Sequence, residues 1–224
     1  MPTTLITQAK NHHETEQLLL GKVTLRGQID VPEGATGIVL FAHGSGSSRL
    51  SPRNQLVARI LRSAGLATLL FDLLSEEEEQ LDMRTRHLRF DIKLLSERIL
   101  EAATWLESNA HTQGLKAGLF GSSTGGAAAL EAAARKPDYI HAVVSRGGRP
   151  DLAGPSLLKV KCPTLLIVGE RDEAILTLNR DALTRLTCTK ELVTIPGASH
   201  LFEEPGALEK VAVCAADWFK SHLV

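Results

Sequence analysis

Short apolar runs alternate along the chain with longer stretches of helical periodicity. The runs are rich in β-formers and predict strands at residues 37–42, 67–71, 115–120, 140–144, 164–168 and 191–195. Between them, apolar residues recur every three to four positions over 92–106 and 208–219, which is typical of amphipathic helices. Strands that are apolar throughout are buried on both faces. The pattern therefore predicts a mostly parallel, doubly wound α/β sheet with helices on both faces.

Organisation along the chain is simple, with no internal repeat and no linker. We expect an N-terminal extension over residues 1–17 and a single domain over residues 18–224. Residues 18–31 alternate between apolar and polar, which predicts an antiparallel, hairpin-like edge. The four glutamates at 76–79 indicate a solvated loop or the start of a helix, since acidic side chains favour helix N-termini.

Composition excludes several classes of protein. With 25 Lys and Arg against 26 Asp and Glu, the 224-residue chain has a formal charge of −1, and it has nine aromatic residues. A nucleic-acid-binding protein needs a basic face or stacking platforms, so we expect no nucleic-acid partner. No apolar run is long enough for a membrane span or a signal core, and three widely spaced cysteines suit a reducing compartment. We expect a cytoplasmic protein.

The strongest chemical signal follows the strand predicted at 115–120. Gly121-Ser122-Ser123-Thr124-Gly125 has the pattern G-x-S-x-G and leads into an Ala-rich helix. A nucleophile on a sharp strand-to-helix turn needs small neighbours, because a Cβ at either glycine would collide with the backbone. The turn also directs Ser123 toward the helix N-terminus, which favours a developing anion. Ser123 is therefore the candidate nucleophile.

A serine nucleophile needs a base, and the base needs an orienting acid. Asp172 and His200 each follow a predicted strand, and loops at the carboxyl ends of parallel strands meet at one edge. We assign His200 as the base and Asp172 as its partner. Glu170 and Glu173 flank Asp172 and are alternative acids.

The glycine-rich segment at 43–48 follows the strand predicted at 37–42. Its glycines allow backbone N–H groups to point inward. We expect the oxyanion hole to use the N–H groups of Ser45 and Thr124, with Gly46 as the reserve donor. His43, at the start of the segment, is expected to order the loop.

These four segments, in this order, resemble the α/β-hydrolase superfamily, and within it the small dienelactone-hydrolase-like branch. The resemblance covers roughly residues 18–222. It implies an α/β-hydrolase fold with Ser123 as nucleophile, His200 as base and Asp172 as partner. One feature departs from the branch, because dienelactone hydrolases use a cysteine where this chain has Ser123. None of the chain's three cysteines is placed to substitute, so a serine esterase is expected.

Many members of this superfamily insert a lid where this chain has only residues 145–163, so we expect a minimal cap and an open site for small soluble esters or lactones. Gly46 and Arg146 are candidate substrate-binding residues. Arg146 and Arg149 could bind a carboxylate or phosphate on the substrate, and the alternative is that they form ion pairs with Asp151 or nearby carboxylates. We expect no metal and no cofactor, and a monomer or homodimer. The alternatives are a thioesterase or acyltransferase with the same triad, or a non-catalytic binding module.

Overall fold

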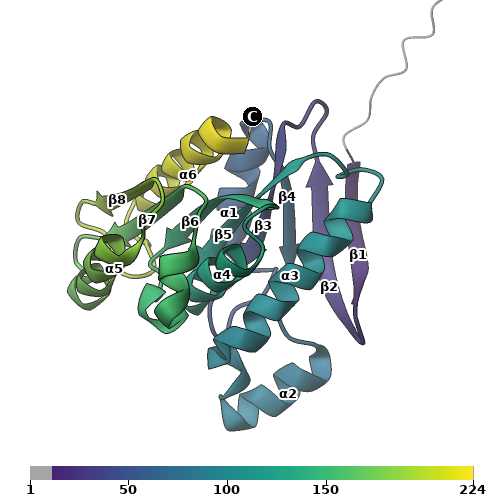
Figure 1. Cartoon of the computed structure of the whole chain (residues 1–224), viewed down its shortest axis with the longest axis horizontal. Helices are drawn as coiled ribbons and strands as arrows, with labels where there is room; N and C mark the ends of the chain where they lie inside the picture. Colours follow the sequence, from purple (N-terminus) through teal and green to yellow (C-terminus); the bar gives the residue numbers. More distant parts are fainter. Residues whose placement is uncertain (1–11, 224) are drawn as a thin grey trace, which may run out of the picture.

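Eight strands form one sheet in the computed structural model, which describes residues 12–223 (Figure 1). Their order across the sheet is β1-β2-β4-β3-β5-β6-β7-β8. In chain order the strands are β1 His12–Leu20, β2 Val23–Val31, β3 Gly37–Ala42, β4 Ala67–Phe71, β5 Lys116–Ser122, β6 Ile140–Arg146, β7 Thr164–Gly169 and β8 Lys190–Ile195. The pairs from β4 to β8 are parallel, which confirms the predicted sheet.

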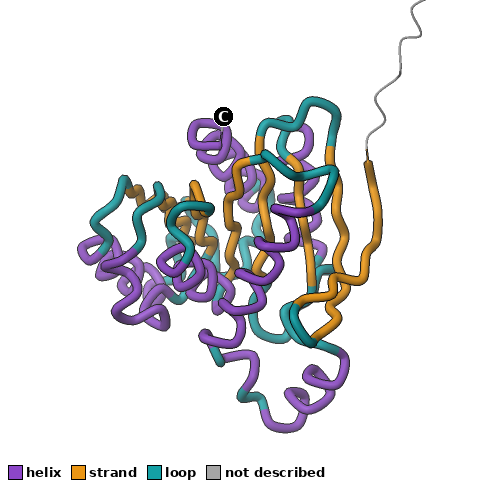
Figure 2. The backbone as a smooth tube through the Cα atoms, turned by 45° about the vertical axis from the view of Figure 1, so that its right-hand side comes forward, coloured by secondary structure: helices purple, strands orange, loops and turns teal. Residues whose placement is uncertain are grey.

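Helices cover both faces of this sheet. They are α1 Pro52–Ser63, α2 Glu76–Thr85, α3 Ile92–Ser108, α4 Thr124–Arg135, α5 Glu173–Arg185 and α6 Ala207–Leu223, with 3₁₀ segments at Leu88–Phe90 and Pro150–Lys159. α3, α4 and α5 pack on one face, and α1 and α6 pack on the other (Figures 1 and 2). Among residues 12–223, none of the helices has the length and apolar character needed to cross a bilayer.

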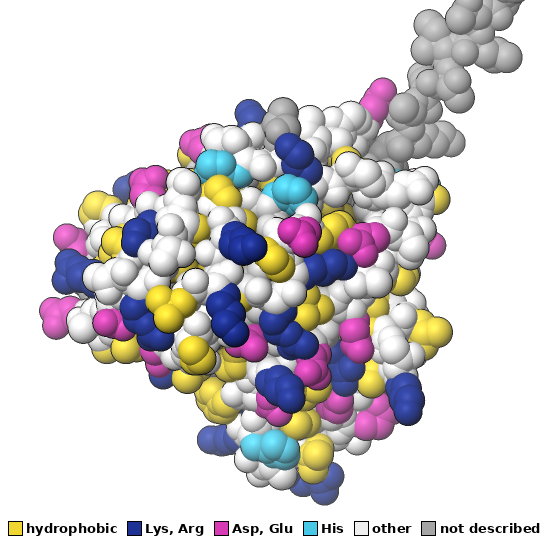
Figure 3. All heavy atoms as spheres, in the orientation of Figure 1, with side chains coloured by type: hydrophobic (Ala, Val, Ile, Leu, Met, Phe, Trp, Pro, Cys, Tyr) yellow, Lys and Arg dark blue, Asp and Glu magenta, His cyan; other side chains and the backbone are white. Residues whose placement is uncertain are grey.

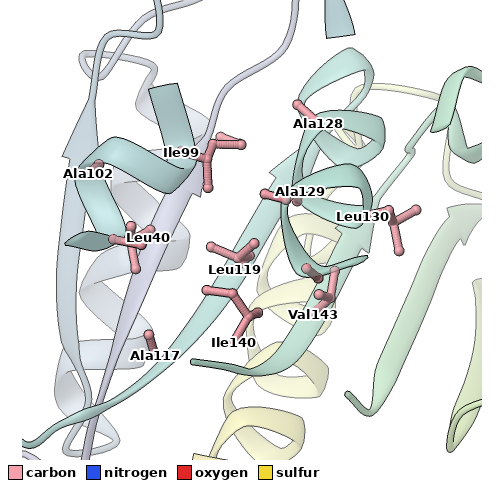
Figure 4. Close-up of a cluster of buried hydrophobic side chains, with 14 of the residues drawn as sticks. Leu40, Ile99, Ala102, Ala117, Leu119, Ala128, Ala129, Leu130, Ile140 and Val143 are labelled. Atoms are coloured by element: carbon pink, nitrogen blue, oxygen red, sulfur yellow. The ribbon is translucent and has the colours of Figure 1, made fainter. Parts of the chain in front are cut away.

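The core consists of two apolar layers separated by the sheet. In β3, Leu40 points into the layer under α3 and α4, where it joins Leu119 from β5 (Figure 4). The next residue, Phe41, points into the opposite layer, where its ring lies 5.0 Å from that of Phe120. Each such side chain stabilises the fold by about 1.5–3 kcal/mol. This burial on both faces explains why the strand signals in the sequence are continuous rather than alternating.

The edge of the sheet differs from the prediction. We expected a hairpin over residues 18–31, but β1 begins at His12 and pairs with β2 along its whole length. Residues 12–17, which we placed in an extension, therefore belong to the hairpin. Residues 1–11 of that extension lie outside the described residues. β2 in turn pairs antiparallel with β4, which attaches the hairpin to the parallel strands.

The glutamates at 76–79 begin α2, which extends beyond the sheet on the side where β4 ends (Figure 1). Ser75 and Glu78 form a capping box at its start. Asp82 is buried and accepts hydrogen bonds from the backbone N–H and Nε of Arg89, at 3.1 and 2.5 Å. Basic and acidic side chains are interspersed on the face seen in Figure 3.

Candidate active site

The turn between β5 and α4 holds Ser123 in a strained backbone conformation. Its φ of 52° and ψ of −120° are uncommon for a residue other than glycine, at a cost of about 1–3 kcal/mol. The glycines on either side of Ser123 are required because no side chain fits at their positions. A Cβ on Gly121 would lie 2.5 Å from the Cα of Gly126, and one on Gly125 would lie 2.1 Å from the carbonyl oxygen of Ala42. The crowding that the sequence pattern predicts is therefore present.

His200 and Asp172 meet at the carboxyl edge of the sheet. Asp172 follows β7 and His200 follows β8, and Nδ1 of the imidazole lies 2.5 Å from Oδ2 of the carboxylate. Because an ionised carboxylate only accepts hydrogen bonds, Nδ1 carries the proton and donates it to this bond. The other ring nitrogen, Nε2, is left with a lone pair. The Asp172 side chain is 14% exposed and that of His200 is 38% exposed, so the ring remains accessible.

The two alternative acids lie elsewhere. Oε2 of Glu170 accepts a hydrogen bond from the N–H of Gly197 at 2.7 Å. Glu173 is the first residue of α5. Among the described residues, the hydrogen bond from the His200 ring goes to Asp172, and neither glutamate pairs with it.

Ser123 and His200 line one cavity of about 240 Å³, here called the serine cavity. Glycines allow the surrounding segments to approach closely. A Cβ on Gly44 would lie 3.2 Å from the Ser123 Cβ, and one on Gly147 would lie 3.5 Å from His200 Nδ1. Within residues 12–223 no hydrogen bond joins the Ser123 hydroxyl to the imidazole. Such bonds are often long in unliganded enzymes and shorten when substrate binds.

Two backbone N–H groups are available next to Ser123. Thr124 is the first residue of α4, so its N–H has no partner within the helix. Ser45 lies in the tight turn closed by the bond from the Ser47 N–H to the Gly44 carbonyl, at 3.1 Å. In the described part of the chain, the N–H groups of Thr124 and Ser45 have no hydrogen-bond acceptor. They are therefore free to stabilise a negative charge.

His43 anchors the loop that carries Ser45. Its Nε2 accepts a hydrogen bond from the N–H of Leu73, just after β4, and its Nδ1 donates to the Gly44 carbonyl, both at 3.0 Å. Burial holds the pKa of His43 below its usual value of 6.5. The ring is therefore neutral at physiological pH, as both hydrogen bonds require. The same loop is tied to Asp72 by Arg49.

Gly46 lies outside the serine cavity. It lines a smaller cavity of about 30 Å³, together with Thr124 and Arg89. Its φ is 68°, and a Cβ there would lie 3.4 Å from Nη1 of Arg89. Gly46 thus lies against Arg89, in the segment after α2, and is not among the residues that line the serine cavity.

Arg146, at the end of β6, does line the serine cavity. Two further residues of that cavity, Arg53 and Asn54 in the first turn of α1, were not predicted from the sequence. Oδ1 of Asn54 accepts a hydrogen bond from the buried hydroxyl of Ser122 at 3.2 Å. Only the fold brings these residues together, since Asn54 and Ser122 are 68 positions apart. No local signal at the start of α1 indicated this contact.

Arg149 forms the predicted ion pair with Asp151, through bonds of 2.8 and 2.7 Å. Arg146 does not, so the alternative role holds for one arginine and not for the other. Near His200, Glu204 accepts a hydrogen bond from the Ser199 N–H, which with further hydrogen bonds lowers its pKa to about 2. Among residues 12–223, no group of three or more His, Cys, Asp or Glu side chains is arranged to hold a metal ion.

Similarity to known proteins extends over most of the chain. A model of the dienelactone hydrolase family matches residues 25–222. The crystal structure of a dienelactone hydrolase from Anabaena variabilis is 59% identical, with a TM-score of 0.94 over 96% of this chain and 99% of that one. Est1E from Butyrivibrio proteoclasticus shares the fold, with a TM-score of 0.76 at 16% identity over 92% of this chain and 98% of its own.

Two Mycobacterium tuberculosis proteins carry a different name. They are described as candidate phosphoribosyl transferases and are 54% identical to this chain over 210 residues. The match covers 94% of this chain but 46% of those proteins. The chain therefore spans about half the length of the curated relatives it matches.

Proposed function

The chain belongs to the dienelactone hydrolase family, and we propose that it is a serine hydrolase that cleaves small soluble esters or lactones through an acyl-enzyme on Ser123. The predicted α/β-hydrolase fold is confirmed by the family match and by the TM-score of 0.94. The observation that carries the proposal is the position of Ser123. It lies on a strained turn and shares a cavity with an imidazole already oriented by Asp172.

The proposed reaction has two steps. In the first, Ser123 Oγ attacks the ester carbonyl carbon while His200 Nε2 takes the hydroxyl proton. The N–H groups of Ser45 and Thr124 stabilise the resulting oxyanion. The C–O bond to the leaving group then breaks, and His200 returns the proton to the departing alcohol. In the second step, water attacks the acyl-enzyme with His200 as base, and Ser123 regains its proton.

A serine rather than a cysteine is the proposed nucleophile. Cys162 is buried in the core, and burial raises the pKa of its thiol to about 12. A thiol with such a pKa is not ionised at neutral pH and is a poor nucleophile. Cys188 and Cys214 do not line the serine cavity.

The test is loss of turnover and of covalent labelling. Ser123→Ala should lower kcat for 4-nitrophenyl acetate by about three or more orders of magnitude. It should also abolish the mass increase that a fluorophosphonate causes. Ser63→Ala is the matched control, because that hydroxyl is exposed and bonds only to its own helix. Full turnover or full labelling of Ser123→Ala would exclude Ser123 as nucleophile.

The same residues also suit a thioesterase or an acyltransferase, since choice of acceptor depends on pocket shape. A purely binding module would take up no fluorophosphonate. Phosphoribosyl transfer rests on the name of proteins of which this chain spans 46%. The dienelactone hydrolase match covers most of this chain, so hydrolysis is the better supported activity. Comparing hydrolysis and transfer rates on one acyl donor separates these alternatives.

A further inference from the structure

The guanidinium of Arg146 is buried without a charge partner. The residue is 7% exposed, and within the described chain its Nε and Nη1 have no hydrogen-bond acceptor. Its Cζ lies 5.9 Å from the centroid of the Phe202 ring. Leaving buried donors unpaired is costly, and more so for a charged group. A cost of this kind usually has a functional reason.

A second arginine lies close to it. Arg53, in the first turn of α1, also lines the serine cavity, and its Nε is buried without a partner in residues 12–223. Its Nη1 lies 3.4 Å from Glu203, whose side chain is 64% exposed, so this pair is well screened by solvent. Burial and, after it, the like charge of Arg53 lower the pKa of Arg146 to about 10. A pKa of about 10 leaves the Arg146 guanidinium charged at neutral pH.

No acidic side chain compensates these charges inside the cavity. Its lining, taken from the described residues, is Gly44, Ser45, Ser47, Ser51, Arg53, Asn54, Ser122, Ser123, Arg146, His200 and Leu201. The first turn of α1 also has no Asp or Glu, so the positive end of that helix adds to the field of the arginines. The cavity next to the proposed nucleophile thus carries two positive charges and a helix N-terminus.

We propose that the serine cavity binds a phosphate group carried by the substrate, with Arg146 and Arg53 as its ligands. The inference rests on the proposed function, since it names the substrate class of the same site. A phosphate monoester carries a charge close to −2 at pH 7 and has three acceptor oxygens, so it can satisfy both guanidinium groups. A carboxylate has one charge and would compensate Arg146 alone, leaving Arg53 with only its solvent-screened pair with Glu203. The phosphate is a spectator: only the ester C–O bond breaks.

The experiment measures binding of inorganic phosphate at fixed ionic strength by calorimetry, in the wild-type chain and in Ser123→Ala. We expect saturable binding in both, because the phosphate ligands do not include the hydroxyl. Arg146→Gln and Arg53→Gln should each weaken binding by about tenfold or more. Arg149→Gln is the matched control and should bind like wild type, because Asp151 already occupies that guanidinium. If Arg146→Gln fails to fold, Arg53→Gln, which is partly exposed, carries the test.

The outcomes separate the two proposals. No saturable phosphate binding, or binding unchanged in both arginine variants, overturns the phosphate site. Binding of acetate as tight as that of phosphate overturns the choice of phosphate over carboxylate. The wild-type chain could bind phosphate and yet show neither fluorophosphonate labelling of Ser123 nor ester turnover. That result supports the phosphate site and rejects the hydrolase proposal. Competitive inhibition of 4-nitrophenyl acetate hydrolysis by inorganic phosphate supports both.

Discussion

The glycine at position 125 offers a direct test of how tightly the Ser123 turn is packed. A Cβ there would lie 2.1 Å from the Ala42 carbonyl oxygen and 2.5 Å from that of His43, whereas ordinary contact begins at 3.4 Å. Both obstacles are backbone, so the start of α4 or the end of β3 would have to move by about 1 Å. Overpacking of a core usually costs about 1–3 kcal/mol, and a clash with backbone lies at or above the upper end.

Gly126→Ala is the matched control on the same helix. Its Cβ would lie 2.6 Å from the Ser145 Oγ, which is the end of a side chain and can rotate, and 3.1 Å from the Cα of Gly148, which has to yield by only a few tenths of an ångström. Replacing a helical glycine by alanine also gains about 1 kcal/mol of helix propensity. We therefore expect the free energy of unfolding of Gly126→Ala to stay within about 1 kcal/mol of wild type.

Urea unfolding and ester turnover measure the two effects together. Gly125→Ala should lose about 3 kcal/mol or more of unfolding free energy. It should also lose kcat, because the displaced backbone leads directly into the loop that carries Ser45. A Gly125→Ala variant as stable and as active as Gly126→Ala would refute the packing described for this turn.

Two further predictions concern the imidazoles. Asp172→Asn should lower kcat for ester hydrolysis by up to about 10⁴-fold with the fold intact. Glu170→Gln should have a kcat near that of wild type. Equal losses of kcat in the two variants would reject Asp172 as the orienting acid. The pKa of His43 is lowered in the folded chain, so below about pH 6.5 the unfolded chain binds more protons than the folded chain. The free energy of unfolding therefore falls as the pH falls from about 6.5 through the folded-state pKa. His43→Gln should show a smaller loss between pH 7.5 and 5.5 in urea unfolding, and an unchanged slope would contradict the neutral ring.

The sequence predicts the interior of the fold better than its margins. β3 and β4 begin and end where the apolar runs do, because burial on both faces leaves a continuous signal. The start of β1 was predicted at residue 18, six residues too late, because residues 12–17 are polar and form a strand only by pairing with β2. α2 was recognised only at its acidic start, because its outer face remains exposed, as at Met83.

The candidate site divides in the same way. Motifs that lie directly after strands could be located, because parallel topology brings strand ends to one edge. Arg53 and Asn54 could not, since they begin a helix and reach the cavity only because the fold brings the start of α1 against Ser122 at the end of β5. The sequence also left the partner of Arg146 open between a substrate anion and Asp151. In the structure, Asp151 forms its ion pair with Arg149, and Arg146 lines the serine cavity.

Backbone strain at Ser123 and unpaired buried atoms of Arg53, Arg146 and Thr124 occur together at one edge of the sheet, and their proximity needs a physical reason. The Ser123 backbone and the Arg146 guanidinium each cost free energy in the folded chain, and the N–H groups of Ser45 and Thr124 have no acceptor among the described residues. Each is also a group that becomes favourable once a carbonyl and an anion occupy the cavity. A fold that holds such groups rigidly avoids the cost of orienting them during the reaction. The same groups would be liabilities in a chain that only had to fold, which favours a binding and catalytic role for this edge of the sheet.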